Sequence, residues 1–315
     1  MIDDLSPYLQ FIIASSMLIF GSNMLIDNCK LLAEKFNISK FVIGVTVLAL
    51  GTSLPELVVS LSAILKVHPE GDIVIGNIIG SNIANIALVF GSVILIQQLS
   101  IDRDNKLRFN LITLILLTFL FNLFLITTNT IQRFEGLILI FILIIYLLVL
   151  FTKFSREKLN NHNSISNFRI INILFLIVGF ILLKYGSELF VNSAISISKN
   201  LGFSNYIGIS MTLVALGTSL PELITSIISI IKKEQGLAIG NIIGSNIINI
   251  SLVGGLSASI LNININLDLI RVHLIIFLLL TFFIFIIGYY KIKINRLIGF
   301  SFLCIYSYFI IMNFK

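Results

Sequence analysis

The nine residues ALGTSLPEL occupy Ala49–Leu57 and occur again, unchanged, at Ala215–Leu223. A second match follows each copy. It reads IGNIIGSNIANIALV at Ile75–Val89 and IGNIIGSNIINISLV at Ile239–Val253, with differences at two of fifteen positions. Two long matches in the same order indicate an internal repeat, so we expect the chain to consist of two related halves.

The composition places both halves in a lipid bilayer. Of the 315 residues, 57% are hydrophobic and only 11% are charged, whereas a soluble domain carries about 25% charged residues. Apolar runs of about 20 residues, enough to cross a hydrocarbon core, recur along the whole length. These runs lack the alternation of transmembrane β-strands. The sequence therefore predicts an all-α membrane protein.

Hydropathy and loop signals together predict about ten transmembrane helices in two five-helix repeats. The predicted spans are 6–27, 41–65, 73–97, 109–127, 134–152, 169–193, 205–231, 237–260, 272–289 and 296–313. The first repeat covers 1–152, a polar linker follows at 153–168, and the second repeat covers 169–315. Because five is an odd number, the second repeat must be inverted in the membrane, an architecture typical of transporters with substrate sites near the midplane.

The loop charges predict the orientation of the chain. Five Lys and Arg residues fall on the side of the termini and fifteen on the opposite side, with Lys184 inside a span. Basic loops stay on the cytoplasmic side, so we expect both termini outside and the linker in the cytoplasm. The start, MIDDLSPY, lacks the basic flank of a cleaved signal peptide, so the first helix is expected to remain.

Glu56 and Glu222 fall deep inside apolar spans at equivalent repeat positions, with no Lys or Arg in either span. An ionisable residue at the bilayer centre costs about 2.5–3.5 kcal/mol on insertion scales. A protonated, hydrogen-bonded Glu in a packed core is one explanation. A bound cation is the better one, because the duplication brings two such residues to one interface.

A proline precedes each of these glutamates. Pro55 and Pro221 each remove a helical hydrogen bond and displace the carbonyl four residues earlier, that of Gly51 or Gly217, so each helix is expected to break there. The freed carbonyls around 49–52 and 215–218 become oxygen ligands if they line a cavity. A purely structural kink is the alternative.

The second motif predicts both close packing and a polar face. Gly76 and Gly80 stand four apart, as do Gly240 and Gly244, a spacing typical of closely packed helices. Two stripes of polar side chains share helical faces at i, i+4 and i+8. The stripes are Asn77, Ser81 and Asn85 in the first copy, and Asn241, Ser245 and Asn249 in the second. Interhelical hydrogen bonding would explain some of them, but a stripe facing two Glu-bearing breaks favours ligation.

All these ligands are oxygens, which suits Na⁺ and Ca²⁺, leaves Mg²⁺ open, and suits Zn²⁺ or Cu⁺ poorly. His68 and His162 fall in predicted loops and His273 at the edge of the predicted span 272–289, and Cys29 and Cys304 do not indicate a disulfide framework. Lys184 and Glu188, four residues apart in the sixth span, are expected to pair locally, with a part in an ion path as the alternative.

At these motifs the sequence resembles the calcium/cation antiporter superfamily, in particular the prokaryotic sodium/calcium exchangers. GTSLPE and GNIIGSNIAN carry the resemblance, which covers essentially the whole chain. It implies a multi-pass protein of the prokaryotic plasma membrane that exchanges Na⁺ for Ca²⁺. It also implies that the first and sixth helices slide as a gating unit.

The resemblance implies specific roles for the repeated residues. Glu56 and Glu222 would be the central ligands, and the carbonyls of Thr52 and Thr218 would join them on Ca²⁺. Of the other implied ligands, the serines and alanines would complete the Na⁺ sites, and the two asparagines would occupy the remaining positions beside the glutamates. These ligands are the hydroxyls of Ser53, Ser219, Ser81 and Ser245, the carbonyls of Ala49 and Ala215, and the side chains of Asn85 and Asn249.

Asn249 departs from the pattern, because many relatives carry Asp there. Asn neither titrates nor adds charge, so the glutamates supply at most −2 to the site. Potassium-dependent relatives use Asp at this place, so we expect no K⁺ co-transport and no proton coupling through this position.

The leading hypothesis is therefore an electrogenic, alternating-access Na⁺/Ca²⁺ antiporter. The alternative is an H⁺/Ca²⁺ or other cation antiporter on the same scaffold. A passive channel fits paired midplane carboxylates less well. An intramembrane hydrolase using Ser53 or Ser219 would need a nearby base, and no predicted span has a buried His. We expect no enzyme activity and no cofactor, and as partners only Ca²⁺, Na⁺ and lipid, with no nucleic acid and no obligatory protein.

Overall fold

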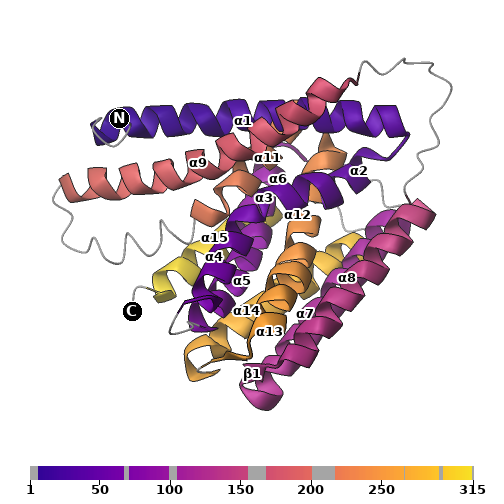
Figure 1. Ribbon diagram of the computed structural model, residues 1–315, viewed down its shortest axis with the longest axis vertical. Coiled ribbons are helices and arrows are strands. Elements are labelled where there is room, and N and C mark those ends of the chain that lie inside the picture. The colour runs from indigo at the N-terminus through magenta and orange to yellow at the C-terminus, as the bar shows by residue number, and fades with distance from the viewer. Residues whose placement is uncertain are drawn as a thin grey trace.

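A computed structural model describes residues 6–66, 71–98, 105–154, 168–200, 217–265, 267–290 and 294–313, and these are almost entirely helical (Figure 1). The first half contains α1 (Pro7–Phe36), α2 (Lys40–Ile43), η1 (Gly44–Leu48), α3 (Ala49–Thr52), α4 (Leu54–Ile64), α5 (Gly71–Ile83), η2 (Ala84–Phe90), α6 (Gly91–Ile96), α7 (Asn105–Thr128), β1 (Thr130–Ile131) and α8 (Arg133–Phe154). The second contains α9 (Ile170–Asn200), α11 (Leu220–Ile231), α12 (Gln235–Ile248), η3 (Asn249–Gly254), α13 (Gly255–Ile260), β2 (Ile263–Asn264), α14 (Leu267–Tyr289) and α15 (Arg296–Asn313).

Seven helices in the described part of the chain are long and apolar enough to cross a membrane, and the bent pair Lys40–Thr52 and Leu54–Ile64 makes an eighth. Shorter apolar helices lie at Leu220–Ile231 and Arg296–Met312, where the seventh and tenth spans are predicted. The prediction of a multi-pass helical membrane protein is confirmed. The exact number of ten crossings stays a prediction, as does the polar linker, whose residues 155–167 lie outside the described ones.

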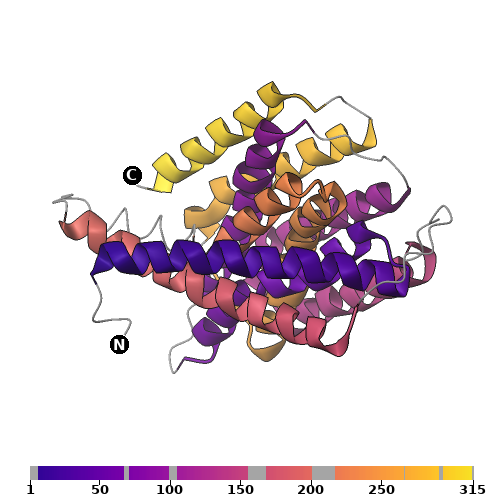
Figure 2. The same cartoon turned by 90° about the horizontal axis from the view of Figure 1, so that it is seen from above.

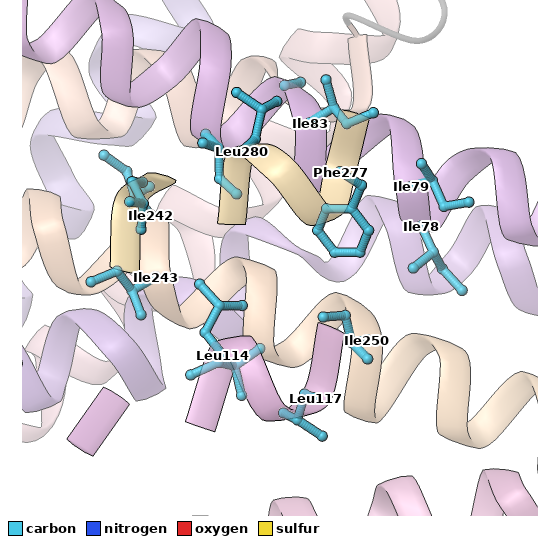
Figure 3. Close-up of a cluster of buried hydrophobic side chains, with 14 of the residues drawn as sticks. Ile78, Ile79, Ile83, Leu114, Leu117, Ile242, Ile243, Ile250, Phe277 and Leu280 are labelled. Atoms are coloured by element: carbon cyan, nitrogen blue, oxygen red, sulfur yellow. The ribbon is translucent and has the colours of Figure 1, made fainter. Parts of the chain in front are cut away.

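The two helices that carry the GNIIGSN motif form the centre of the molecule. In the most apolar 18-residue stretch of each helix, 78% of the residues are buried in Gly71–Ile96 and 89% in Gln235–Ile260. In the other five long helices the buried share is only 28–50%. Their isoleucines meet side chains of α7 and α14, such as Leu114, Leu117, Phe277 and Leu280 (Figure 3). Most polar residues of the repeated motif on these two helices, including Ser81, Asn85, Ser245 and Asn249, are therefore buried in protein, away from lipid.

α1 and α9 form a separate layer. They run side by side obliquely across one face of the bundle (Figures 1 and 2). Glycines allow the close approach, because a Cβ at Gly21 would lie 2.9 Å from the Gly179 carbonyl oxygen. Leu18, Leu25 and Leu183 belong to a hydrophobic cluster distinct from the main core. The same cluster contains Ile43 and Leu237, so it packs the layer against α2 and α12 of the bundle.

At its C-terminal half α1 is also tied to the hairpin between α11 and α12. Lys232 Nζ lies 2.7 Å from Asp27 Oδ1, and Lys30 Nζ lies 3.2 Å from Glu234 Oε1. Glu234 also pairs with Lys40 at 2.7 Å. These charges belong to loops and helix ends on the predicted cytoplasmic side.

Three segments have the wider π-helical turn, which the sequence did not predict. They are η1, which directly precedes the first ALGTSLPEL copy, and η2 and η3, which overlap the C-terminal ends of the two longer matches. π-Helical turns are frequent at functional sites, because the wider turn changes the direction of side chains along the helix. Asn85 lies in η2 and Asn249 begins η3.

The expected ion pair between Lys184 and Glu188 is not formed in the described structure. The Lys184 ammonium instead lies over the Tyr185 ring, 5.1 Å from its centroid. An aromatic face attracts a cation electrostatically, which explains why the lysine turns away from the acid.

Candidate functional site

The first ALGTSLPEL copy forms a broken helix. α3 ends at Thr52, Ser53 leaves the helical conformation with φ −85° and ψ 7°, and α4 begins at Leu54. The helices before and after the break differ in direction by 44°. Pro55 lies at the start of α4, where its missing N–H is tolerated. The predicted break is confirmed in this copy.

The second copy has the same local geometry. Ser219 has φ −91° and ψ 2°, and α11 begins at Leu220 with Pro221 in its first turn. Leu223 N donates to the Ser219 carbonyl at 3.1 Å, as Leu57 N does to Ser53 at 3.2 Å. Residues 201–216, including the predicted ligand Ala215, lie outside the described ones.

These breaks place both glutamates in the first turn of a helix, Glu56 in α4 and Glu222 in α11. Both side chains are fully buried. A helix N-terminus carries a partial positive charge, which stabilises a carboxylate there. Ser53, three residues before Glu56, donates to Glu222 Oε1 at 3.3 Å, which brings the second glutamate to the break that carries the first. Two like charges held together in a buried site need a cation or protons to balance them.

The asparagine-bearing segments pack across the two repeats. α4, with Glu56, contacts η3, and α11, with Glu222, contacts η2. Asn249 of η3 and Asn85 of η2 are both fully buried. Each glutamate-bearing helix of one repeat thus lies against the asparagine-bearing segment of the other.

Hydroxyl groups from both repeats complete the cluster. Ser53 Oγ donates to Glu222 Oε1 at 3.3 Å. Thr52 Oγ1 lies 3.3 Å from Ser245 Oγ, and the equivalent pair in the other repeat, Thr218 Oγ1 and Ser81 Oγ, is 3.4 Å apart. The structure therefore places Ser81 and Ser245 of the second motif against the threonines of the first motif from the opposite repeat.

Many buried polar atoms in this cluster have no hydrogen-bond partner among the described residues. They include both carboxylate oxygens of Glu56, Glu222 Oε2, Ser219 Oγ, and the amide oxygen and nitrogen of Asn85 and of Asn249. Leaving such a group unsatisfied costs about 1–3 kcal/mol, more if it is charged. Most of these atoms are oxygens, so the cluster is suited to hold a cation with oxygen ligands.

The described residues contain no cluster of three or more His, Cys, Asp and Glu side chains that would hold a metal ion. Amides, hydroxyls and two carboxylates supply the donors here. This set suits a hard, transported cation better than a permanently bound transition metal.

Sequence reasoning missed two serines beside the site, Ser60 and Ser226, which are fully buried. Asn77 Nδ2 donates to Ser60 Oγ at 2.9 Å, and Asn241 Nδ2 donates to Ser226 Oγ at 3.2 Å. A signal was present, because each serine follows its repeated glutamate by four residues and so shares its helical face.

Close packing around the second motif is confirmed. A Cβ on Gly240 would lie 3.0 Å from Gly44 Cα, and a Cβ on Gly244 would lie 2.8 Å from Ala49 Cβ. For Gly76 and Gly80 the repeat-equivalent packing segment falls within 201–216, outside the described residues.

Comparison with known proteins gives consistent matches. The family model described as "Sodium/calcium exchanger protein" matches residues 6–152 and 171–315. The sodium/calcium exchanger MaX1 of Methanosarcina acetivorans is 30% identical, covering 79% of this chain and 82% of that protein. The putative antiporter CaxA of Alkalimonas amylolytica is 36% identical, covering 78% and 77%. The structure of the sodium-calcium exchanger NCX_Mj superposes with a TM-score of 0.82 at 32% identity, covering 96% of each chain.

Proposed function

We propose that this chain, which belongs to the sodium/calcium exchanger protein family, exchanges Na⁺ for Ca²⁺ across the membrane by alternating access. The observation that carries the proposal is the pair of buried glutamates, each at a helix break and each facing the asparagine-bearing segment of the other repeat. One site of this kind serves both ions in turn, because both prefer oxygen ligands.

The proposed ligands differ between the two ions, because Ca²⁺ carries twice the charge of Na⁺ and needs more negative charge around it. Ca²⁺ takes both carboxylates, Glu56 and Glu222, with the carbonyls of Thr52 and Thr218. Na⁺ carries half the charge and is held by one carboxylate together with neutral oxygens. The neutral donors are Ser53, Ser81, Ser219, Ser245, Asn85, Asn249 and the carbonyl of Ala49, with Ala215 added on the sequence prediction.

Alternating access requires part of the protein to move against a fixed site. We propose α1 and α9 as the moving part. The hydrophobic cluster through which they pack on the bundle supports this assignment, because it is distinct from the main core, which can stay closed when the layer shifts. The two inverted five-helix repeats, with both termini outside, would then supply the two related access routes.

We propose a stoichiometry of three Na⁺ for each Ca²⁺, which makes the exchange electrogenic. A tenfold Na⁺ gradient is worth about 1.4 kcal/mol per ion, and one net charge crossing 100 mV adds about 2.3 kcal/mol. Three Na⁺ thus supply about 6.5 kcal/mol, enough for a Ca²⁺ gradient above ten-thousandfold, whereas electroneutral two-for-one exchange supplies about 2.8 kcal/mol.

The exchange is proposed to be independent of K⁺. The described site contains two carboxylates, because Asn249 supplies a neutral amide. Ca²⁺ alone balances these two charges, so a K⁺ bound together with Ca²⁺ would need further negative charge.

Ca²⁺ uptake into proteoliposomes tests the proposed function. Vesicles loaded with Na⁺ and diluted into Na⁺-free buffer should accumulate Ca²⁺, while vesicles with equal Na⁺ on both sides should not. Parallel vesicles with an imposed pH gradient and no Na⁺ test the H⁺/Ca²⁺ alternative, and added K⁺ should not change the rate. Uptake that follows the pH gradient and ignores Na⁺ would contradict the proposal.

A further inference from the structure

A chain of hydrogen bonds joins the two motifs beside the site. Asn241 Nδ2 donates to Ser226 Oγ at 3.2 Å, and Thr52 Oγ1 donates to Asn241 Oδ1 at 3.0 Å. Thr52 Oγ1 lies 3.3 Å from Ser245 Oγ. All four side chains are fully buried. This series of hydrogen bonds therefore runs without interruption from Ser226 in α11 to Asn241 in α12, then to Thr52 in α3 and back to Ser245 in α12.

Asn241 gives this chain a direction. An amide nitrogen only donates and an amide oxygen only accepts, so the bond to Ser226 leaves Oδ1 facing Thr52 as an acceptor. The Thr52 hydroxyl has a single hydrogen, which goes to Asn241 in the shortest of its hydrogen bonds. In its contact with Ser245 the Thr52 oxygen must accept, and so Ser245 donates.

The direction of these hydrogen bonds decides whether the Ser245 oxygen can accept a cation at the ion site. Thr52 precedes Ser53, which donates to Glu222 Oε1 at 3.3 Å, so the contact between Thr52 and Ser245 lies beside the glutamates. A Ser245 hydroxyl that points its hydrogen at Thr52 turns its lone pairs away from Thr52, where a cation can use them. Without Asn241 as an acceptor, the Thr52 hydrogen would go to the Ala49 carbonyl or to Ser245, each 3.3 Å away, and at either proposed Na⁺ ligand it would compete with the cation.

We propose that Asn241 is a positioning residue that orients the hydroxyls of Thr52 and Ser245 so that Ser245 can ligate Na⁺. This inference rests on the proposed function, in which Ser245 is a ligand for Na⁺ and not for Ca²⁺. It predicts a specific effect on Na⁺ affinity, which a purely structural asparagine would not have.

The glycines of the same motif bring Asn241 to Thr52. A Cβ on Gly240 would lie 2.5 Å from the Phe41 carbonyl oxygen, and one on Gly244 would clash with the backbone of Val45. Only glycine at these positions lets α12 lie so close to η1 and α3. The residue after each glycine, Asn241 or Ser245, then faces the end of α3. The spacing Gly-Asn-x-x-Gly-Ser thus serves both packing and orientation.

The equivalent asparagine of the first repeat provides a matched control. Asn77 Nδ2 donates to the Glu56 carbonyl and to Ser60 Oγ, both at 2.9 Å. Both of these bonds are donated, and neither sets the direction of a hydroxyl on the opposite repeat. Asn77 is half-buried, so Asn77→Ala removes two partly buried hydrogen bonds between neighbouring helices without removing an acceptor for Thr52.

The test measures Na⁺ and Ca²⁺ dependence separately in reconstituted protein. Asn241→Ala should raise the half-saturating Na⁺ concentration by about five- to tenfold, the effect of losing about one hydrogen bond. Its half-saturating Ca²⁺ concentration should change by no more than about twofold. Asn77→Ala should change the dependence on the two ions in equal proportion, whatever its effect on the maximal rate.

Thr52→Val tests the same chain without altering Asn241, because it keeps the shape of the side chain and the backbone carbonyl. It should reproduce the selective loss of Na⁺ affinity. Combined with Asn241→Ala it should add little, because both variants interrupt one chain. Thr52→Ser, which keeps the hydroxyl, should restore near-normal Na⁺ dependence.

Equal shifts for Na⁺ and Ca²⁺ in Asn241→Ala and Thr52→Val, or wild-type Na⁺ dependence in either folded variant, would overturn the inference. Failure of the proposed function looks different, because the wild-type protein itself would then show no Na⁺-dependent Ca²⁺ uptake.

Discussion

Replacing Glu56 or Glu222 with glutamine is expected to reduce Na⁺-driven Ca²⁺ uptake by more than about 100-fold. A charge pair about 4 Å apart at an effective dielectric constant of about 20 is worth roughly 4 kcal/mol, and a divalent ion doubles that figure. Since about 1.4 kcal/mol corresponds to a factor of ten, even part of this loss exceeds two decades in affinity. Glutamine retains the size and one oxygen, so the variant isolates the charge.

The measurement is initial Ca²⁺ uptake by equal amounts of reconstituted wild-type and variant protein. Glu135→Gln is the matched control, because Glu135 lies in the first turn of α8 and accepts a hydrogen bond from Gln132 N at 2.8 Å, which a glutamine carbonyl can also accept. The control should transport at near wild-type rates. Transport within a few-fold of wild type in both Glu56→Gln and Glu222→Gln would refute the assignment of the site.

The second large effect concerns membrane potential. If three Na⁺ exchange for one Ca²⁺, one net charge crosses the membrane in each cycle. A change of 100 mV then shifts the steady-state Ca²⁺ ratio by about 2.3 kcal/mol, or roughly 40-fold. Potential made more negative on the Ca²⁺-depleted side should favour Na⁺ entry there and deepen the depletion.

Vesicles clamped with a K⁺ gradient and valinomycin give this measurement, with internal and external Ca²⁺ determined at steady state. The same vesicles at zero potential provide the reference. A steady-state ratio that does not respond to potential would establish electroneutral exchange and contradict the proposed stoichiometry.

The repeat made much of the architecture predictable. Glu56 and Glu222 stood out because acids are rare in this sequence and these two occupy equivalent positions in apolar spans. Pro55 predicted a break near Gly51, because proline cannot continue the helical hydrogen bonds, and the structure places the break at Ser53. Both inferences depend on local chemistry, and the structure agrees with them where it describes the residues.

Features that depend on packing were not predictable in the same way. The π-helical segments η2 and η3 result from fitting an extra residue into a buried turn, and no residue type marks that. α1 extends to Phe36, well beyond the predicted end at residue 27. Hydropathy measures only the part that lies in lipid, whereas the helix ends where Asn37 adopts a left-handed conformation with φ 52°.

The pairing of β1 with β2 was also missed, because two-residue strands carry no periodic pattern. Ser60 and Ser226 were missed for a different reason. Their spacing from the glutamates was visible, but a serine in a helix usually bonds its own backbone, and only the packed structure shows that these two accept from Asn77 and Asn241.

The central claim is that Na⁺ and Ca²⁺ compete for one site built around Glu56 and Glu222. Equilibrium Ca²⁺ binding to the purified protein, measured over a series of Na⁺ concentrations at fixed pH, tests it most directly. At high Na⁺ the apparent dissociation constant for Ca²⁺ should rise with about the third power of the Na⁺ concentration. Binding at this site should be lost in the Glu56→Gln, Glu222→Gln double variant. A Ca²⁺ affinity that does not change with Na⁺, or that survives in the double variant, would contradict the account.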